Sequence, residues 1–333
     1  MVRLKDIAEE LNITVNSVSK ALRGMKGTSL ELQKKVQETA RRMKYVPNSA
    51  AQCLRTNSTK ILAVLFDNLL NPYYSIMLDL LVKNLQKHGY TCILFSIVSS
   101  KLPIVNEETM LKVISRNVDG IISFIDVDEN SKILLEKYRL PVFLFSRKPA
   151  DESLNYFSCD DVSGGYIATK HLIELGHKKI AFLGYIDNLQ IAHDRLNGYK
   201  KALEEAGIPY DLDLVSQRTE KFFTGSAMIE NLLSRRRDFS AFVSFNDYFA
   251  YDAIAKLFEC GYTVPGDFSV VGYDNLGSHV ANPIPLTSVG YDKQSFVLEF
   301  IESVLKKLVD AEAPNFSKTI EPTLYLGKTT RQL

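Results

Sequence analysis

The chain has 333 residues, which is more than a single ordinary hydrophobic core holds and suits two or three domains. Hydrophobic residues make up 46% and charged residues 24%, as in soluble globular proteins, and the longest apolar runs, such as residues 61–66, are far too short to span a membrane. The net charge of +1 is unevenly distributed, because residues 1–60 carry twelve lysines and arginines against five acids, which leaves +7 there and −6 in the remainder. A basic N-terminal segment on a mildly acidic body indicates that only this segment meets a polyanion.

The N-terminal segment shows three short helical patterns. Apolar residues at positions 4, 7, 8 and 11 form one helical stripe, and residues 12–13 make a tight break after it. Thr14 is suited to cap a second helix that ends near residue 22. A T-x-x-E capping box at residues 28–31 predicts a third helix that ends near residue 44. Three short helices with a tight turn between the first two predict a helix-turn-helix unit.

A short connecting segment follows. Pro47 ends the third helix, because proline disfavours helical conformation in the residue before it. Residues 49–55 provide only one or two helical turns, too few to be stable in isolation, and they place Ala51 and Leu54 on one face. Residues 56–60 are a polar linker.

From residue 61 the pattern changes to apolar, β-rich runs that alternate with helical segments. The expected strands are residues 61–66, 92–96, 120–124, 142–145, 179–184, 241–245 and 269–272. Such alternation predicts parallel sheets covered by helices on both faces. About 270 residues of it are enough for two doubly wound lobes, and a ligand is expected in the crevice at the carboxyl ends of the strands.

Six segments of the sequence resemble the LacI/GalR (lactose-repressor) family of transcription regulators in their order and spacing. They are LKDIAEELNITVNSVSKALRG, YVPNSAAQCLR, HLIELGHKKIAFLG, DRLNGYKKALEEAGI, FNDYFAYDAI and DFSVVGYDN. The resemblance covers essentially the whole chain. It implies an α/β protein with an all-α helix-turn-helix head (1–46), a hinge helix and linker (47–60) and a body (61–333) similar to periplasmic sugar-binding proteins. The first lobe is expected at about 61–160 and 291–320, and the second at about 161–290 and 321–333.

The resemblance implies that the helix at residues 15–22 enters the major groove of DNA. Val15, Asn16 and Lys20 match the base-reading positions: an asparagine can pair with adenine and a lysine can donate to guanine. The alternative for these residues is a solvated polar face. Contacts to phosphates, which set register without reading sequence, are expected from Thr14, Ser17 and Ser29.

The same resemblance assigns DNA contacts to the hinge. Asn48, Ala51 and Leu54 match its positions, and in the family two such helices of a dimer pair in the minor groove, where a leucine wedges between central bases. Leu54 occupies that position here. An apolar wedge kinks the duplex at a cost of about a few kcal/mol per unstacked step, which added contacts offset. The alternative is a linker leucine packed on the head.

The resemblance also implies an effector site in the crevice. Arg195 and Asp274 match positions that clamp the effector, and a guanidinium with a carboxylate suits a sugar-like ligand; a structural ion pair is the alternative. Arg147 lies where many members carry an acid, so it either meets an anionic effector or replaces a lost contact. A sugar, a sugar phosphate, a nucleoside and no effector at all stay open. Further matches to pocket positions are Tyr73, Tyr74, Asp161 and Asn246.

These observations predict a cytoplasmic, homodimeric repressor that binds a pseudo-palindromic DNA operator under the control of a small molecule, a sugar or sugar derivative. Its runner-up is a solute-binding receptor without an operator role, which the basic head and the missing secretory signal disfavour. No GxSxG, GxxxxGK[ST], HExxH or GxGxxG motif follows a strand, so we expect no enzyme. Four scattered cysteines without a CxxC indicate reduced thiols, and we expect neither a cofactor nor a metal.

Overall fold

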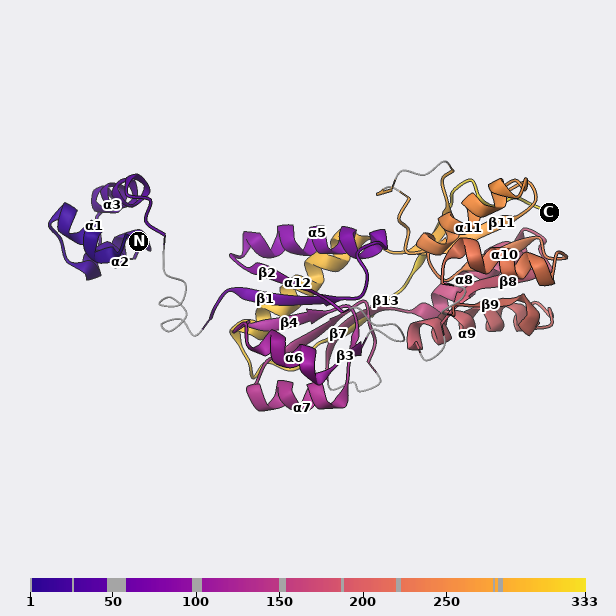
Figure 1. The fold of residues 1–333 in the computed structure, drawn as a ribbon, viewed down its shortest axis with the longest axis horizontal. Coiled ribbons are helices and arrows are strands. Elements are labelled where there is room, and N and C mark those ends of the chain that lie inside the picture. The colour runs from indigo at the N-terminus through magenta and orange to yellow at the C-terminus, as the bar shows by residue number, and fades with distance from the viewer. Residues whose placement is uncertain are drawn as a thin grey trace. The chain divides into compact units, whose positions relative to one another are not determined.

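The computed structural model divides the chain into two compact units, residues 1–59 and residues 60–333, which we call the head and the body (Figure 1). The residues that the structure describes are 2–25, 27–46, 58–97, 104–149, 154–186, 189–219, 223–277, 279–280 and 284–333. Among these residues, every helix is too short or too polar to cross a membrane.

Three short helices form the head: α1 (Leu4–Leu11), α2 (Val15–Leu22) and α3 (Leu30–Arg42). After α1 comes Asn12, whose left-handed backbone (φ of 50°) turns the chain sharply toward α2. Thr14 caps α2 as predicted, because its hydroxyl oxygen accepts a hydrogen bond from Ser17 N at 3.1 Å.

The start of α3 differs from the prediction. Ser29, rather than Thr28, is the cap residue, and its hydroxyl oxygen accepts a hydrogen bond from Leu32 N at 3.2 Å. Thr28 instead donates its hydroxyl to Met25 O at 2.9 Å. The capping box at residues 28–31 is therefore wrong by one residue, because the preceding turn already uses the threonine hydroxyl.

The head has its own small core. Ile7 of α1, Val18 of α2 and Val36 of α3 are completely buried against one another. Ala8, Ala21 and Ala40 are buried beside them. The helical stripe read from the sequence thus faces this core, and the opposite side of α2 is exposed.

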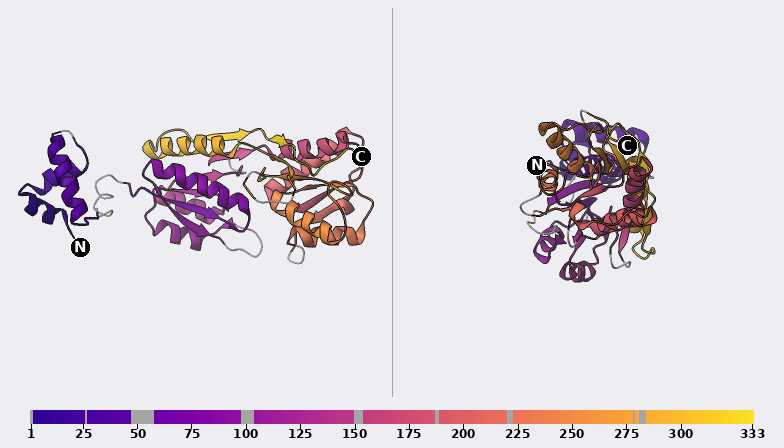
Figure 2. Two further views of the ribbon diagram at one scale, coloured as in Figure 1. Left: turned by 90° about the horizontal axis from the view of Figure 1, so that it is seen from above. Right: turned by 90° about the vertical axis from the view of Figure 1, so that its right-hand side faces the viewer.

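The body contains two six-stranded sheets, each covered by helices on both faces (Figures 1 and 2). The first sheet is parallel throughout, with strand order β13-β7-β6-β4-β1-β2. Helices α5 and α12 pack on one face, and α6 and α7 on the other. The elements of this lobe are β1 (Ile61–Phe66), α5 (Pro72–Lys87), β2 (Thr91–Ser96), α6 (Glu107–Ile114), β4 (Gly120–Ser123), α7 (Glu129–Tyr138), β6 (Val142–Phe145), β7 (Asn155–Cys159), α12 (Lys293–Val309) and β13 (Ser317–Ile320), with a small parallel pair, β3 (Ile104–Val105) and β5 (Asp126–Val127).

The second sheet has strand order β14-β12-β11-β10-β8-β9, and only the edge strand β14 runs antiparallel. Helices α8 and α9 pack on one face, and α10 and α11 on the other. Its elements are α8 (Asp161–Glu174), β8 (Ile180–Tyr185), α9 (Gln190–Glu205), the short 3₁₀ helix η1 (Leu212–Leu214), β9 (Val215–Gln217), α10 (Gly225–Arg235), β10 (Ala241–Ser244), α11 (Asp247–Glu259), β11 (Ser269–Tyr273), β12 (Thr287–Gly290) and β14 (Thr323–Tyr325). The predicted fold class is confirmed.

The chain passes between the two lobes three times: from β7 to α8, from β12 to α12 and from β13 to β14. In both sheets the strand order reverses direction near the middle, between β1 and β4 and between β8 and β10. The loops after these strands form crevices in doubly wound folds, because neighbouring connections leave toward opposite faces there.

Candidate functional site

The exposed side of α2 carries the residues predicted to read bases. Val15, Asn16 and Lys20 are all exposed, and the Val15 side chain has 43% of its surface accessible despite being apolar. α2 carries no acidic residue in its first turn and has Lys20 in its last. This face offers a methyl surface, an amide and an ammonium group. Together they can match the hydrogen-bond donors, the acceptors and the thymine methyl groups that base pairs expose in the major groove.

The residues predicted to contact phosphates have structural roles as well. Thr14 and Ser29 cap α2 and α3, and Ser17 shares a hydrogen bond of 2.9 Å with Thr14 through its hydroxyl. Their hydroxyls therefore sit at helix N-termini, where the helix dipole favours an anion. The predicted hinge contacts lie outside the described residues: Asn48, Ala51 and Leu54.

A cavity of about 270 Å³ lies between the two lobes of the body. Its walls come from the loops that follow β1, β4, β6, β8, β9, β10, β11 and β12, which are the carboxyl ends of strands in both sheets. The structure brings together in this one cavity all the residues predicted for the effector site: Tyr73, Tyr74, Arg147, Asp161, Arg195, Asn246 and Asp274.

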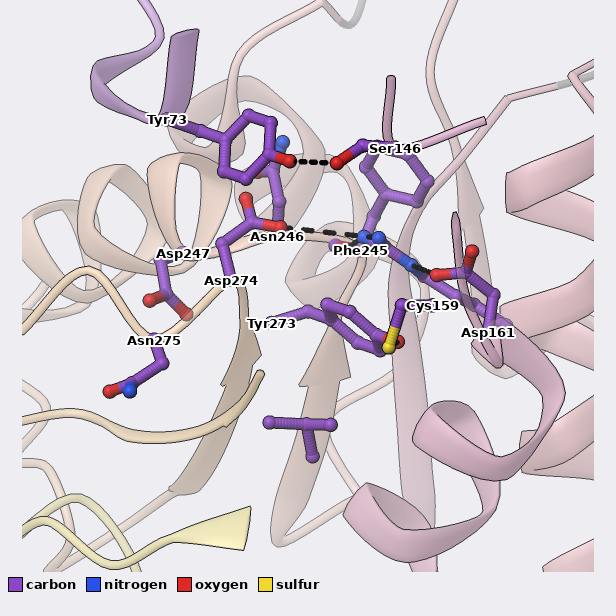
Figure 3. Close-up of polar contacts among 12 residues, drawn as sticks. Tyr73, Ser146, Cys159, Asp161, Phe245, Asn246, Asp247, Tyr273, Asp274 and Asn275 are labelled. Atoms are coloured by element: carbon purple, nitrogen blue, oxygen red, sulfur yellow. Dashed lines mark hydrogen bonds and ion pairs between the residues drawn. The ribbon is translucent and has the colours of Figure 1, made fainter. Parts of the chain in front are cut away.

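Arg195 is the most enclosed charge in the cavity. Its Nε donates to Asp161 Oδ1 at 2.8 Å, and its Nη2 lies 3.9 Å from Asp274 Oδ1. The guanidinium lies 3.5 Å from the centre of the Tyr273 ring and 4.8 Å from that of Phe245, whose carbonyl oxygen it also contacts. Arg195 and Asp274 thus form an ion pair within the second lobe, and the acidic and aromatic side chains around the guanidinium are drawn in Figure 3.

Asp274 connects this cluster to the crossover between the lobes. Burial raises its pKa to about 7, which Arg195 and Lys293 partly offset. Lys293 begins α12 of the first lobe, and its ammonium donates to the backbone carbonyls of Asp274 at 2.6 Å and Asn275 at 2.7 Å in the second lobe. Because Asp274 and Asn275 both have positive φ angles, 107° and 50°, their carbonyls can face this one ammonium group.

Three hydroxyls form a cluster on the first-lobe side of the cavity. The Tyr73 hydroxyl is hydrogen-bonded to Ser146 (Figure 3). The Tyr291 hydroxyl bonds to Tyr73 at 2.8 Å and to Ser146 at 2.9 Å. Tyr74 packs edge-on against Tyr73 and Phe124. Asn246 caps α11 by accepting a hydrogen bond from Phe249 N at 2.9 Å. Tyr73 and Asn246 therefore hold the wall in place through local contacts.

Sequence reasoning missed several residues of the site. Asp67, Arg218 and Phe223 line the cavity, and Lys293 supports Asp274 from behind. Asp67 directly follows β1, so the rule that ligands bind at strand carboxyl ends would have found it. No comparable signal marks Lys293, because its partners are backbone carbonyls far away in the sequence.

Among the described residues, no group of three or more histidines, cysteines, aspartates and glutamates is placed to hold a metal ion. The site consists instead of ion pairs, hydroxyl groups and aromatic rings at the carboxyl ends of the strands of both sheets. Such a cavity, largely apolar with a few convergent polar groups, is typical of a small-molecule receptor.

Comparison with known proteins agrees with this class. Residues 169–330 match the family model of the periplasmic binding protein-like domain. The HTH-type transcriptional repressor PurR of Aliivibrio salmonicida is 26% identical over 337 residues, covering all of both chains. The crystal structure of the lac repressor dimer bound to operator and the anti-inducer ONPF has a TM-score of 0.82, 21% identity and 99% coverage of each chain. A complex of the regulator CelR with cellobiose has a TM-score of 0.70 at 24% identity, covering 99% of this chain and 100% of that one.

The fold and the cavity thus define a two-lobed receptor of the periplasmic-binding-protein type joined to a helix-turn-helix head. These matches support the resemblance to the LacI/GalR family of transcriptional regulators that the sequence indicates. The named full-length relatives are transcriptional repressors, which agrees with the prediction that the chain is not an enzyme.

Proposed function

We propose that the protein is a transcriptional repressor that binds a pseudo-palindromic operator as a homodimer and releases or tightens its hold when a small molecule occupies the cavity. The observation that carries this proposal is the combination within one chain of an exposed, polar and cationic α2 and a cavity that collects all seven predicted effector residues. Two heads related by a twofold axis would read the two halves of the operator.

In this proposal α2 lies in the major groove. Asn16 pairs with an adenine, Lys20 donates to a guanine and Val15 contacts a thymine methyl group. Thr14, Ser17 and Ser29 lie against phosphates at the ends of α2 and α3. Residues 1–46 of the head are the DNA-reading domain, and residues 61–333 of the body are the sensor.

The sensor half of the proposal rests on the cavity between the lobes. A ligand that contacts both lobes favours one arrangement of them over another, and the change reaches the head through residues 47–60. Coupling of this kind is typically about 1–3 kcal/mol and is reciprocal, so operator DNA and effector alter each other's affinity by the same factor. The proposed partners are operator DNA, a carbohydrate-like effector and a second copy of this chain.

The experiment is a gel-shift titration of the full-length protein against a pool of palindromic sequences enriched by selection. We expect a tight complex that weakens steeply with salt, because lysines and arginines of the head displace counterions from phosphates. Specific binding should exceed non-specific binding by at least about 10³-fold. Weak binding that is uniform across sequences would refute an operator role and leave the solute-receptor alternative.

The hinge part of the proposal concerns residues outside the described ranges. If Leu54 is a minor-groove wedge, Leu54→Ala weakens operator binding and leaves the thermal unfolding of the body unchanged. An unaltered operator affinity would remove this residue from the interface without affecting the role of α2.

A further inference from the structure

The acidic and basic side chains that line the cavity are equal in number, but they are not all paired with one another. The lining includes three carboxylates, those of Asp67, Asp161 and Asp274, and three guanidinium groups, those of Arg147, Arg195 and Arg218. Asp161 and Asp274 are both paired with Arg195, and Asp274 is also close to the ammonium of Lys293. Among the described carboxylates that line this cavity, Asp67 is the one left near both Arg147 and Arg218.

These two arginines come from opposite lobes. Arg147 follows β6 of the first lobe, and Arg218 follows β9 of the second. Within the described parts of the chain, neither guanidinium has a carboxylate oxygen within 4.0 Å. Arg147 uses its Nε to donate to Phe124 O at 2.9 Å, which orients the group, and within the described residues its two Nη atoms donate to no other acceptor. Arg218 lies over the Phe249 ring, 5.9 Å from its centre.

The carboxyl group of Asp67 lies close enough to both guanidinium groups to be affected by their charges. Burial raises the pKa of this carboxyl group, and the charges of Arg218 and then Arg147 lower it. Asp67 therefore lies near both guanidinium groups without an ion pair to either, and both arginines line the same cavity from opposite lobes. Low-dielectric walls strengthen the attraction of such groups for an anion that enters the cavity.

We infer that the effector carries a phosphate group that bridges Arg147 of the first lobe and Arg218 of the second, so that the ligand is a sugar phosphate and not a neutral sugar. This inference rests on the proposed function of the cavity as an effector site. A phosphate ester has three terminal oxygens, enough to accept hydrogen bonds from two guanidinium groups at once. The hydroxyls of Ser146 and Tyr291 and the ring of Tyr74 are available to the polyol part.

Phosphate binding in this arrangement holds the lobes together. Arg147 and Arg218 carry like charges on opposite lobes with the single negative charge of Asp67 near them, and a dianion placed between them attracts both. The effect is absent for a neutral sugar, which has no charge to offer. Asp67 competes with the phosphate for the same two groups.

The test is isothermal titration of the full-length protein with hexose 6-phosphates, their unphosphorylated parents, a hexuronate and inorganic phosphate. We expect each hexose 6-phosphate to bind more tightly than its parent sugar, and inorganic phosphate to bind weakly at the same site. Arg147→Gln and Arg218→Gln should each weaken the phosphorylated ligand by about tenfold or more. Arg147→Lys keeps the charge and should retain part of the affinity, and Arg116→Gln, on an exposed turn, should change nothing.

Asp67→Asn gives a result of opposite sign, since removing the competing carboxylate should tighten sugar-phosphate binding and leave a neutral sugar unaffected. The inference would be overturned if phosphorylated and parent sugars bound equally well, or if the hexuronate bound as tightly as the hexose 6-phosphates. It would also be overturned if the gain in affinity from the phosphate persisted in both Arg→Gln variants. A panel in which neither inorganic phosphate nor any sugar phosphate binds would overturn it as well. Operator binding by gel shift is measured on the same samples, so a failure of the proposed function shows there separately from the ligand class.

Discussion

Arg195 Nε and Asp161 Oδ1 lie 2.8 Å apart, and both side chains are almost completely enclosed, with 7% and 11% of their surfaces exposed. Asp161 begins α8, Arg195 lies in the second turn of α9 and Asp274 follows β11. The ion pair therefore fixes two helices and a strand end at the wall of the cavity. Its energy depends on all the partners remaining, because a buried charge without a partner is costly.

We predict that Arg195→Met destabilises the body by about 3–5 kcal/mol, since it leaves two carboxylates buried without their cation. Urea denaturation followed by circular dichroism measures this change. As a control, Arg236→Met removes ion pairs to Asp211 and Asp238 on the surface, where solvent screens them, and should have a much smaller effect. Equal losses in the two variants would show that the buried cluster adds no special stability.

Two glycines, Gly165 of α8 and Gly198 of α9, allow these helices to pack closely, and this packing sets the position of Arg195 on α9. A Cβ atom on Gly198 would lie 2.0 Å from Val162 O, and one on Gly165 would lie 2.1 Å from the carbonyl oxygen of Arg195. Both helices approach through backbone atoms that cannot move aside. We predict that Gly198→Ala forces the helices apart, costs at least about 1–3 kcal/mol in unfolding free energy and weakens ligand binding.

Gly277→Ala is the matched control for that change. Its Cβ would meet only the Tyr251 hydroxyl, at an ordinary 3.9 Å. Thermal unfolding of both variants, with and without ligand, separates the two cases. If Gly198→Ala unfolds at the wild-type temperature, the helices have more freedom to separate than their contacts indicate.

For helix α2 we make a prediction that concerns only the DNA sequence preferred by the protein. Asn16 is exposed on α2, so Asn16→Ala should leave head stability unchanged and reduce discrimination at one A·T base pair by about 1–3 kcal/mol. Gln37→Ala removes an exposed amide from α3 and should leave the preferred sequence as it is. Binding of each variant to operators with single base-pair changes measures both effects. A uniform loss over all operators would assign Asn16 to the backbone of the DNA instead.

The sequence was sufficient to predict the architecture, because strand and helix periodicities and turn residues are local signals. Thr14 as a cap and residues 61–66 as a buried strand follow from neighbouring residues alone. Contacts between distant segments could not be read in this way. Lys293 meets Asp274 and Asn275 only because the connection from β12 to α12 brings the start of α12 beside the end of β11.

In the candidate site, too, single residues could be located from the sequence, but their contacts with one another could not. Residues such as Arg195 and Asp274 were located by resemblance, yet their mutual contact with Asp161 and the sandwich of Arg195 between rings depended on the fold. Arg218 follows a three-residue strand in a segment without a clear pattern, and nothing in its neighbours indicates that it meets a cavity wall.

A buried carboxyl group behind the cavity should make stability depend on pH. Asp247 is completely buried, where its Oδ2 accepts a hydrogen bond from Leu276 N and its Oδ1 accepts one from the Ser288 hydroxyl, each at 2.7 Å. Burial, followed by the negative charge of Asp274, raises the pKa of Asp247 to about 8. In the unfolded chain an aspartate has a pKa of about 3.9.

The folded state therefore holds a proton that the unfolded state releases between about pH 4 and pH 8. Its contribution to stability is fully present below pH 4 and is lost as the pH rises through 8. We predict that the melting temperature of the wild type falls between pH 6 and pH 9 and that Asp247→Asn, which cannot ionise, flattens this fall. Asp267→Asn changes a carboxyl group whose pKa is lowered by hydrogen bonds from Thr263, so it should leave the slope in this range unaltered. A wild-type slope that persists unchanged in Asp247→Asn would assign the pH dependence to another buried carboxyl group, such as Asp274, whose pKa burial raises to about 7.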